Sequence, residues 1–183
     1  GLYEFGRKDL RIYYNSAEFG LATADSRNGK KWRNAQSTGI NVAGSITADA
    51  SVIMWDGALR LFFKVVPLNN QDSHQVWRAT ATDAEGTQWE IDGLVYKRVG
   101  NPCLDWTSVP HAVVTHDDRV RLYFVCSKGV AQIATAVSDD GKKFKFEQIV
   151  VPHGVDPYVV QEGDGYRIFY AAEAPRERAG IYN

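Results

Sequence analysis

Apolar and polar residues alternate along this chain in short runs that turn-forming residues interrupt. Four runs share one pattern, in which an arginine stands between apolar residues and the run ends on two aromatic residues: DLRIYY (9–14), ALRLFF (58–63), RVRLYF (119–124) and GYRIFY (165–170). Alternation with a period of two, rich in β-branched and aromatic residues, is typical of β-strands, and the Gly, Asp and Asn between the runs favour turns. Because long helix-forming stretches are scarce, the pattern predicts an all-β chain.

A second element follows three of these runs. The segments ATADSRNGKKW (22–32), ATATDAEGTQW (79–89) and ATAVSDDGKKF (134–144) superpose without gaps as Ala-Thr-Ala, four residues, Gly, two residues and an aromatic. Repetition of this kind indicates a repeat architecture and has to be recognised before any motif is interpreted. The closing Trp or Phe of each segment is expected to pack between repeats and not to bind sugar.

The repeat unit has four predicted strands. The aromatic ends of the second strand, at Tyr14, Phe63, Phe124 and Tyr170, recur at intervals of roughly fifty residues, the period of a propeller blade. Each unit reads as strand A (PYVVQE), a hairpin, strand B (GYRIFYAA), a loop, strand C (QIATAVS), a turn and strand D (FKFEQIV). This order predicts one β-propeller domain over 1–183, with four-stranded antiparallel blades at about 1–48, 49–108, 109–155 and, incomplete, 156–183.

The repeats amount to three whole units and about half of a fourth. A propeller closes on itself to remove its sheet edges, so three arrangements are open. The chain is part of a longer one, or it associates with a copy of itself or a partner, or it closes with four blades. We expect the first.

Composition excludes several classes of function. The 183 residues are 44% apolar and 23% charged, and the formal net charge is −1. This near-neutral balance carries no electrostatic footprint for nucleic acid or an anionic membrane, and the longest apolar runs are too short to cross a bilayer. Cys103 and Cys126 could pair, but Cys126 lies in the apolar stretch LYFVCS, where a small buried thiol is expected. The compartment, secreted or cytoplasmic, stays open.

Blade geometry assigns side chains to faces. With strand A innermost, the starts of strands A and the B–C loops share one mouth of the channel, while the A–B hairpins and C–D turns lie on the opposite face. Asp49 and Asp156 start equivalent strands A; the equivalent position is Pro110 in the third repeat and precedes Gly1 in the first. The mouth is also expected to gather side chains from 105–111 and from the B–C loops: Asp105, Trp106, His111, His153, Glu18, Asn69, Asn70, Asp72, His74, Glu173 and Arg176.

Carboxylates that converge on one mouth suit glycosidic chemistry. One protonates the leaving oxygen, while another activates water or attacks the anomeric carbon. Crowding would separate their pKa values and so assign the roles. The alternative is structural, because an Asp at a strand start often accepts from the next backbone N–H groups and Asp-Pro commonly opens a turn. Both interpretations of Asp49 and Asp156 are open at this point.

The other candidates also have two interpretations. Glu173 is either a solvated loop carboxylate or a ligand contact, and His111 and His153 are either packed or functional. No His pair has the HExxH spacing and the cysteines form no CxxC, so neither a metal site nor a cofactor is predicted. Trp106, at the predicted mouth, is a candidate sugar platform, whereas Trp55 falls near the opposite hairpins.

One stretch resembles a known superfamily. DPYVVQEGDGYRIFYAA (156–172), together with a strand carrying A-x-S-x-D-G-x-x-[FW] as in AVSDDGKKF (136–144), resembles the five-bladed propeller glycosidases of the arabinanase/β-xylosidase and invertase/levansucrase groups. The resemblance covers the whole chain as a blade pattern and implies the five-bladed type. It is specific for the fold and less so for activity. The SDDG-type turns also resemble the Asp boxes of sialidases, which are structural.

The resemblance also implies residue roles. In the arabinanase-like group a catalytic Asp opens one strand A, a second Asp that modulates pKa opens another, and a Glu general acid opens a third. Asp49 and Asp156 match the Asp positions. Glu173, in EAP, is similar to the usual Glu-Gly-Pro setting of the acid but follows strand B instead of preceding strand A. The Trp-Met-Asn-Asp-Pro and Glu-Cys signatures of the invertase group are absent.

These observations predict a glycosidase-like propeller that hydrolyses or binds carbohydrate at its channel mouth. Asp49 is expected as base or nucleophile with Asp156 as modulator, and Glu173 or Asp105 as acid. The expected substrate-binding residues are Trp106, His111, His74 and Arg176. The competing hypotheses are a non-catalytic propeller that binds glycan or protein, and another enzyme activity on the same scaffold.

Overall fold

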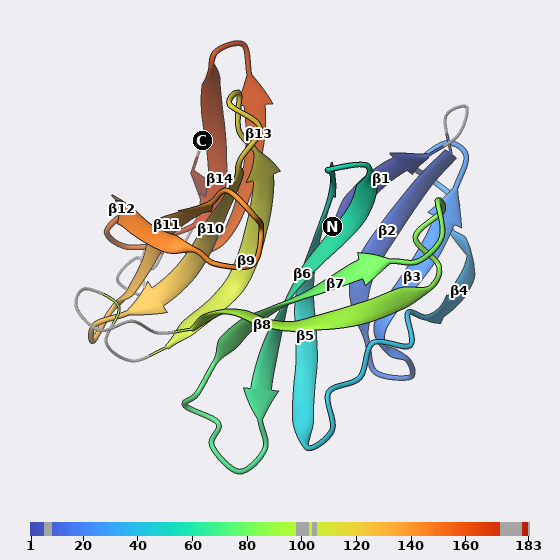
Figure 1. Ribbon diagram of the computed structural model, residues 1–183, viewed down its shortest axis with the longest axis horizontal. Coiled ribbons are helices and arrows are strands. Elements are labelled where there is room, and N and C mark those ends of the chain that lie inside the picture. Colours follow the sequence, from blue (N-terminus) through green and yellow to red (C-terminus); the bar gives the residue numbers. More distant parts are fainter. Residues whose placement is uncertain (6–8, 98–102, 104–105, 173–180, 183) are drawn as a thin grey trace.

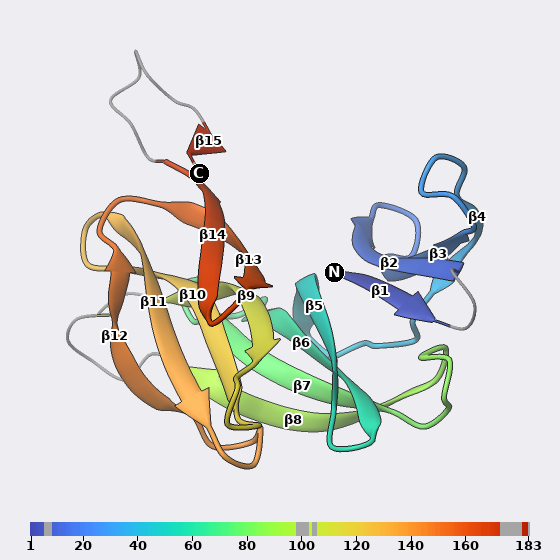
Figure 2. The same cartoon turned by 90° about the horizontal axis from the view of Figure 1, so that it is seen from above.

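The computed structural model describes the chain except for residues 6–8, 98–102, 104–105, 173–180 and 183. Its described part consists of β-strands and turns without a helix, as the alternating pattern predicts. No helix in this part is therefore long and apolar enough to span a membrane. The strands form four antiparallel sheets arranged around a common centre (Figures 1 and 2).

Each sheet is one blade, and its strands follow the chain from the centre outwards. The first blade contains β1 (Leu2–Phe5), β2 (Asp9–Ser16), β3 (Gly20–Ser26) and β4 (Arg33–Ser37). The second contains β5 (Ser45–Trp55), β6 (Ala58–Pro67), β7 (Gln75–Ala81) and β8 (Trp89–Lys97). The third contains β9 (Thr107–Val114), β10 (Val120–Ser127), β11 (Ala131–Ser138) and β12 (Lys145–Val151). The fourth contains β13 (Val155–Glu162), β14 (Gly165–Ala171) and the short β15 (Ile181–Tyr182). This order confirms the propeller architecture.

The repeated runs supply the packing between blades. In β6, Leu59, Leu61 and Phe63 are fully buried in the cluster shared with the first blade, while Phe62 joins the cluster shared with the third. Alternate residues of β6 thus pack against the blades on either side, because successive side chains of a strand point to opposite faces. The aromatic ends of the second motif behave as predicted in two blades: Trp89 packs edge-on against Tyr13, with ring centroids 5.7 Å apart. The Phe144 ring packs likewise against Phe62, at 5.9 Å.

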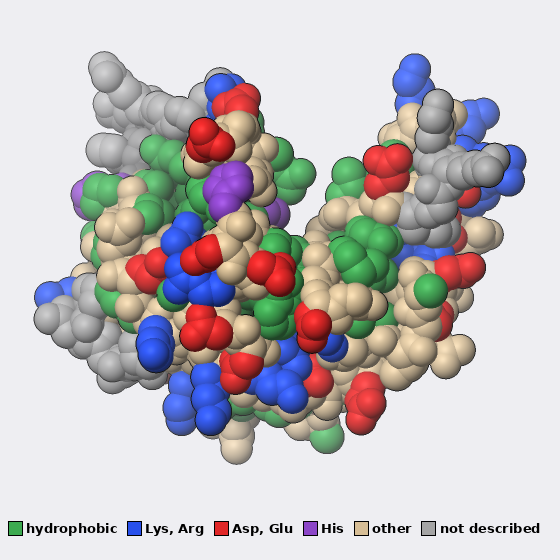
Figure 3. Space-filling view, turned by 45° about the horizontal axis from the view of Figure 1, so that its top comes forward, with side chains coloured by type: hydrophobic (Ala, Val, Ile, Leu, Met, Phe, Trp, Pro, Cys, Tyr) green, Lys and Arg blue, Asp and Glu red, His purple; other side chains and the backbone are tan. Residues whose placement is uncertain are grey.

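The sheets form an open arc. A deep notch separates the first blade from the fourth, and hydrophobic side chains lie on both of its walls (Figure 3). Leu2 on β1 and Tyr158 on β13 are each 50% exposed. Trp32, which ends the first of the three motifs, is also partly exposed. Its counterparts in the second and third blades lie between two sheets.

The structure corrects two sequence-based expectations. The gapless alignment of the second motif is wrong by two residues, because Phe63 pairs with Trp77 where Tyr14 pairs with Ala22. The second blade has two additional residues before its C–D glycine. Cys126 is not a free thiol: it forms a disulfide with Cys103, which attaches the crossover into the third blade to β10.

Candidate functional site

Asp49 and Asp156 occupy the same bulged position in their blades. In β5 the pairing with β6 skips from Ala48 to Ser51, so two residues oppose one of the partner strand. In β13 the pairing with β14 skips in the same way from Val155 to Tyr158. Both aspartates have left-handed backbone conformations, with φ of 55° and 54°. Asp49 therefore lies inside its strand, which begins at Ser45, and not at the strand start that the sequence predicts.

The third blade has the same bulge without an aspartate. The residue there with φ of 46° is Val109, and the pairing between β9 and β10 is irregular at the same place. The equivalent of Asp49 is thus Val109 and not Pro110, one residue away from the prediction. A β-branched residue adopts a positive φ only at a cost. The blade architecture therefore imposes the bulge with or without an aspartate.

Two neighbouring side chains anchor the Asp49 carboxylate. Asn15 at the end of β2 donates from Nδ2 to Asp49 Oδ1 at 2.9 Å, and its own Oδ1 accepts from the backbone N–H of Asp49 at 2.9 Å. Lys64 on β6 forms an ion pair with Asp49 Oδ2. Sequence reasoning missed both partners. A signal existed for Lys64, which is the one charge in the apolar run LFFKVV and so requires a buried partner.

Asp156 has different surroundings. It is exposed and forms no hydrogen bond or ion pair with a described residue. Neither aspartate carboxylate accepts from the backbone N–H groups that follow it within the described residues, which is the contact that the turn-opening interpretation requires. The turn-opening interpretation therefore lacks its defining contact at both positions.

His74 and Trp106 meet beside the Asp49 cluster. Their ring centroids are 5.4 Å apart. Burial, and then the charge of Lys64, lower the pKa of His74, while the charge of Asp49 acts in the opposite direction. The His74 Nδ1 atom is buried and has no hydrogen-bond partner by distance and angle among the described residues, although the backbone of Gln71 acts to raise the pKa of the ring. Because protein atoms enclose Nδ1, the ring edge with this atom is not open to a ligand.

His111 lies between the third and fourth blades. Its ring Nε2 donates to the carbonyl oxygen of Val159 at 3.0 Å, and the ring packs edge-on against Tyr158 at 5.0 Å. Burial lowers its pKa to about 4, although the bond to Val159 acts in the opposite direction. The structure thus gives His111 a packing role between blades.

The remaining predicted residues divide into two groups. Asp105, Glu173 and Arg176 lie outside the described residues. The mouth residues that are described and exposed are Glu18, Asn69, Asn70, Asp72 and His153. No group of three or more metal-ligating side chains occurs in the described part of the chain.

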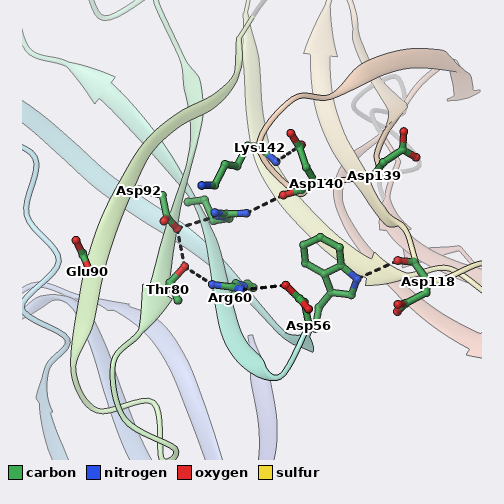
Figure 4. A pocket seen from close by; sticks show the side chains of 11 residues that line it. Asp56, Arg60, Thr80, Glu90, Asp92, Asp118, Asp139, Asp140 and Lys142 are labelled. Atoms are coloured by element: carbon green, nitrogen blue, oxygen red, sulfur yellow. Dashed lines mark hydrogen bonds and ion pairs between the residues drawn. The ribbon is translucent and has the colours of Figure 1, made fainter.

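A cavity of about 750 Å³ lies on the opposite face between the second and third blades (Figure 4). Its floor is a chain of paired charges. Arg78 donates from Nε to Asp92 at 2.8 Å, and Thr80 bonds both Asp92, at 2.7 Å, and Arg60, at 2.6 Å. Burial alone would raise the pKa of Asp92, but the bonds from Arg78 and Thr80 bring it below its usual value.

This cavity also contains bonds that join the two blades. Arg78 Nη1 donates to the carbonyl oxygen of Asp140 at 3.3 Å, and Trp55 Nε1 donates to that of Asp118 at 3.0 Å. Trp55 thus lies near the opposite hairpins, as predicted. The cavity therefore lies at an interface between blades, and within the described residues Arg60 Nε is buried there without a hydrogen-bond partner. We take the channel mouth as the candidate site because the two aspartates at equivalent bulges lie on its strands.

Comparisons with known proteins place this geometry in a fold. No family model matches the chain, and no curated protein sequence does. Solved structures do match. An endo-arabinase from Bacteroides thetaiotaomicron has a TM-score of 0.76 at 15% identity, over 99% of this chain and 72% of that one. An endo-1,4-β-xylanase from the same organism has a TM-score of 0.75 at 14% identity, over 94% of this chain and 64% of that one.

A third matching structure is a GH32 β-fructofuranosidase from Bombyx mori. It has a TM-score of 0.71 at 10% identity, over 96% of this chain and 43% of that one. The chain spans 64% and 72% of the two Bacteroides proteins. It therefore has the fold of the five-bladed β-propeller glycosidases over part of their length, and this confirms the resemblance at the level of fold.

Proposed function

We propose that the channel mouth binds and hydrolyses a carbohydrate, with Asp49 and Asp156 as the carboxylates of the site. The observation that carries the proposal is their position. Both stand on innermost strands, at bulges with φ of 55° and 54°, where Val109 shows that an aspartate is not needed for the backbone. Carboxylates on separate strands around one opening suit a mechanism that divides acid, base and pKa-modulating roles.

The surroundings of Asp49 fit a sugar. The rings of His74 and Trp106 are in tilted contact and partly exposed, and such rings offer an apolar surface against which a sugar ring packs. The fold supports the same substrate class, because the solved neighbours are named as arabinan-, xylan- and fructoside-cleaving enzymes.

The test is hydrolysis by the whole chain of a polysaccharide panel that includes arabinan and xylan, with reducing ends as the readout. We expect release by the unaltered protein and a loss of about 10²-fold or more in Asp49→Asn, the usual cost of removing a catalytic acid or base. Asp156→Asn should also lose activity. Asp164→Asn, in the A–B hairpin of the same blade as Asp156, is the matched control and should keep full activity.

Two results would contradict the proposal. Binding of glycan without release of reducing ends would indicate a carbohydrate-binding propeller. Unchanged turnover in both Asp49→Asn and Asp156→Asn would place the chemistry elsewhere in the molecule.

A further inference from the structure

The residue after the aromatic pair of strand B occupies the same place in every blade. Lys64 pairs with Ala48, directly before the bulge of the second blade. In the fourth blade Ala171 pairs with Val155, directly before the bulge that holds Asp156. Lys64 and Ala171 are therefore structural equivalents, and among the described residues only Asp49 has a cation beside it.

The preceding blade differs in the same way. Asn15 follows Tyr14 in β2 and bonds the aspartate of the next blade. Its equivalent before the fourth blade is Val125, which follows Phe124 in β10 and is buried and apolar. At these two described positions Asp156 thus has apolar neighbours where Asp49 has polar ones. The two carboxylates share a backbone position but not an electrostatic environment.

Among the described residues, Lys64 and Asn15 contact the Asp49 carboxylate directly. The ring of His74 lies beside them, and burial disfavours charge on that ring. Lys64 is thus the cation that pairs with this carboxylate.

We infer that Lys64 is a positioning residue that orients the Asp49 carboxylate as the base or nucleophile of the site, and that Asn15 holds the same carboxylate from the neighbouring blade. The inference rests on the proposed function of the mouth. A charge-assisted contact on each oxygen fixes the direction in which a carboxylate points. A site that gives its carboxylates different environments assigns their roles by doing so.

In the reaction itself, Asp49 acts on water or on the anomeric carbon. As base it takes a proton from water while the new C–O bond forms and the glycosidic C–O bond breaks. The leaving oxygen receives a proton from a carboxylic acid of the site. Lys64 takes no part in the transfer and acts only through Asp49.

The first test does not require turnover. A double-mutant cycle in the whole chain combines Lys64→Met with Asp49→Asn and measures stability by urea denaturation. The two single losses should sum to more than the loss in the double variant, and Lys64→Arg should keep the parent stability. Additive losses would overturn the inference whether or not the protein is an enzyme.

The second test separates kcat from KM. In Lys64→Met we expect kcat to fall about tenfold or more while KM changes less than about twofold, and Lys64→Arg should restore kcat. Arg167→Met, which removes the exposed ion pair with Glu162, is the control and should keep the parent kcat and KM. A Lys64→Met variant with the parent kcat contradicts the inference alone. Absence of hydrolysis by the unaltered protein contradicts the proposed function instead.

Discussion

Asp49 and Asp156 stand at equivalent bulges of two blades and have opposite surroundings. Asp49 is held by Asn15 and Lys64, whereas Asp156 has Val125 and Ala171 at the corresponding positions. The repeated backbone thus fixes where each carboxylate lies, whereas the residue after each aromatic pair fixes which side chain contacts it. Repeats of this kind diversify a site without altering the scaffold.

The largest expected effect is a loss of stability at acidic pH on the side of the molecule that contains Asp156. His111 supports the β13 side through its bond to Val159, and its pKa is lowered from 6.5 to about 4. An unfolded chain would bind a proton on this ring first, so this contribution is complete above pH 6.5 and is lost as the pH falls towards 4. We expect a loss of up to about 3 kcal/mol in the free energy of unfolding, at about 1.36 kcal/mol per pKa unit.

Urea denaturation between pH 7 and 4 measures this loss. His111→Gln, whose amide can still donate to Val159, should flatten the dependence over that range. His153→Gln, at an exposed histidine outside this contact, should leave it unchanged. An equal pH dependence in the parent chain and in His111→Gln would show that the ring does not couple the blade contact to pH.

An intermediate effect is expected on the Asp49 side. Asn15→Ala removes two hydrogen bonds to Asp49, and we expect it to lower the free energy of unfolding by about 1–2 kcal/mol, since bonds to charged groups are the stronger ones. Asp156→Asn removes no described contact and should change stability by less than about 0.5 kcal/mol. Equal losses in the two variants, measured by urea denaturation, would abolish the distinction between the aspartates.

The smallest effect comes from giving Asp156 the neighbour that it lacks. Ala171→Lys places a cation at the position of Lys64, and a partly exposed ion pair stabilises by about 0.2–1 kcal/mol. The gain should shrink in high salt and disappear in the Ala171→Lys/Asp156→Asn double variant. A gain that survives in the double variant would mean that the lysine stabilises through other contacts.

The prediction from sequence was most accurate for the strands. Runs such as ALRLFF and RVRLYF form β6 and β10 because period-two alternation places their side chains on two opposite faces, and each face has a blade to bury it. The prediction was less accurate at connections. A gapless match cannot reveal that the second blade has two additional residues before its C–D glycine. Its Ala-Thr-Ala (79–81) begins two residues after Trp77, which is the structural equivalent of Ala22. The sequence also could not establish that Cys103 pairs with Cys126, because this requires the position of Cys103 relative to β10.

Spacing and periodicity within one blade are enough to predict the repeat, the all-β blades and the two aspartates that share a place in them. Contacts between blades follow only from the tertiary fold. Asn15 contacts Asp49 from a different blade, Trp106 lies against His74, and Arg78 and Asp92 pair in the cavity of Figure 4. Contacts between blades join residues far apart in the chain, and no local pattern encodes which side chain will stand opposite which.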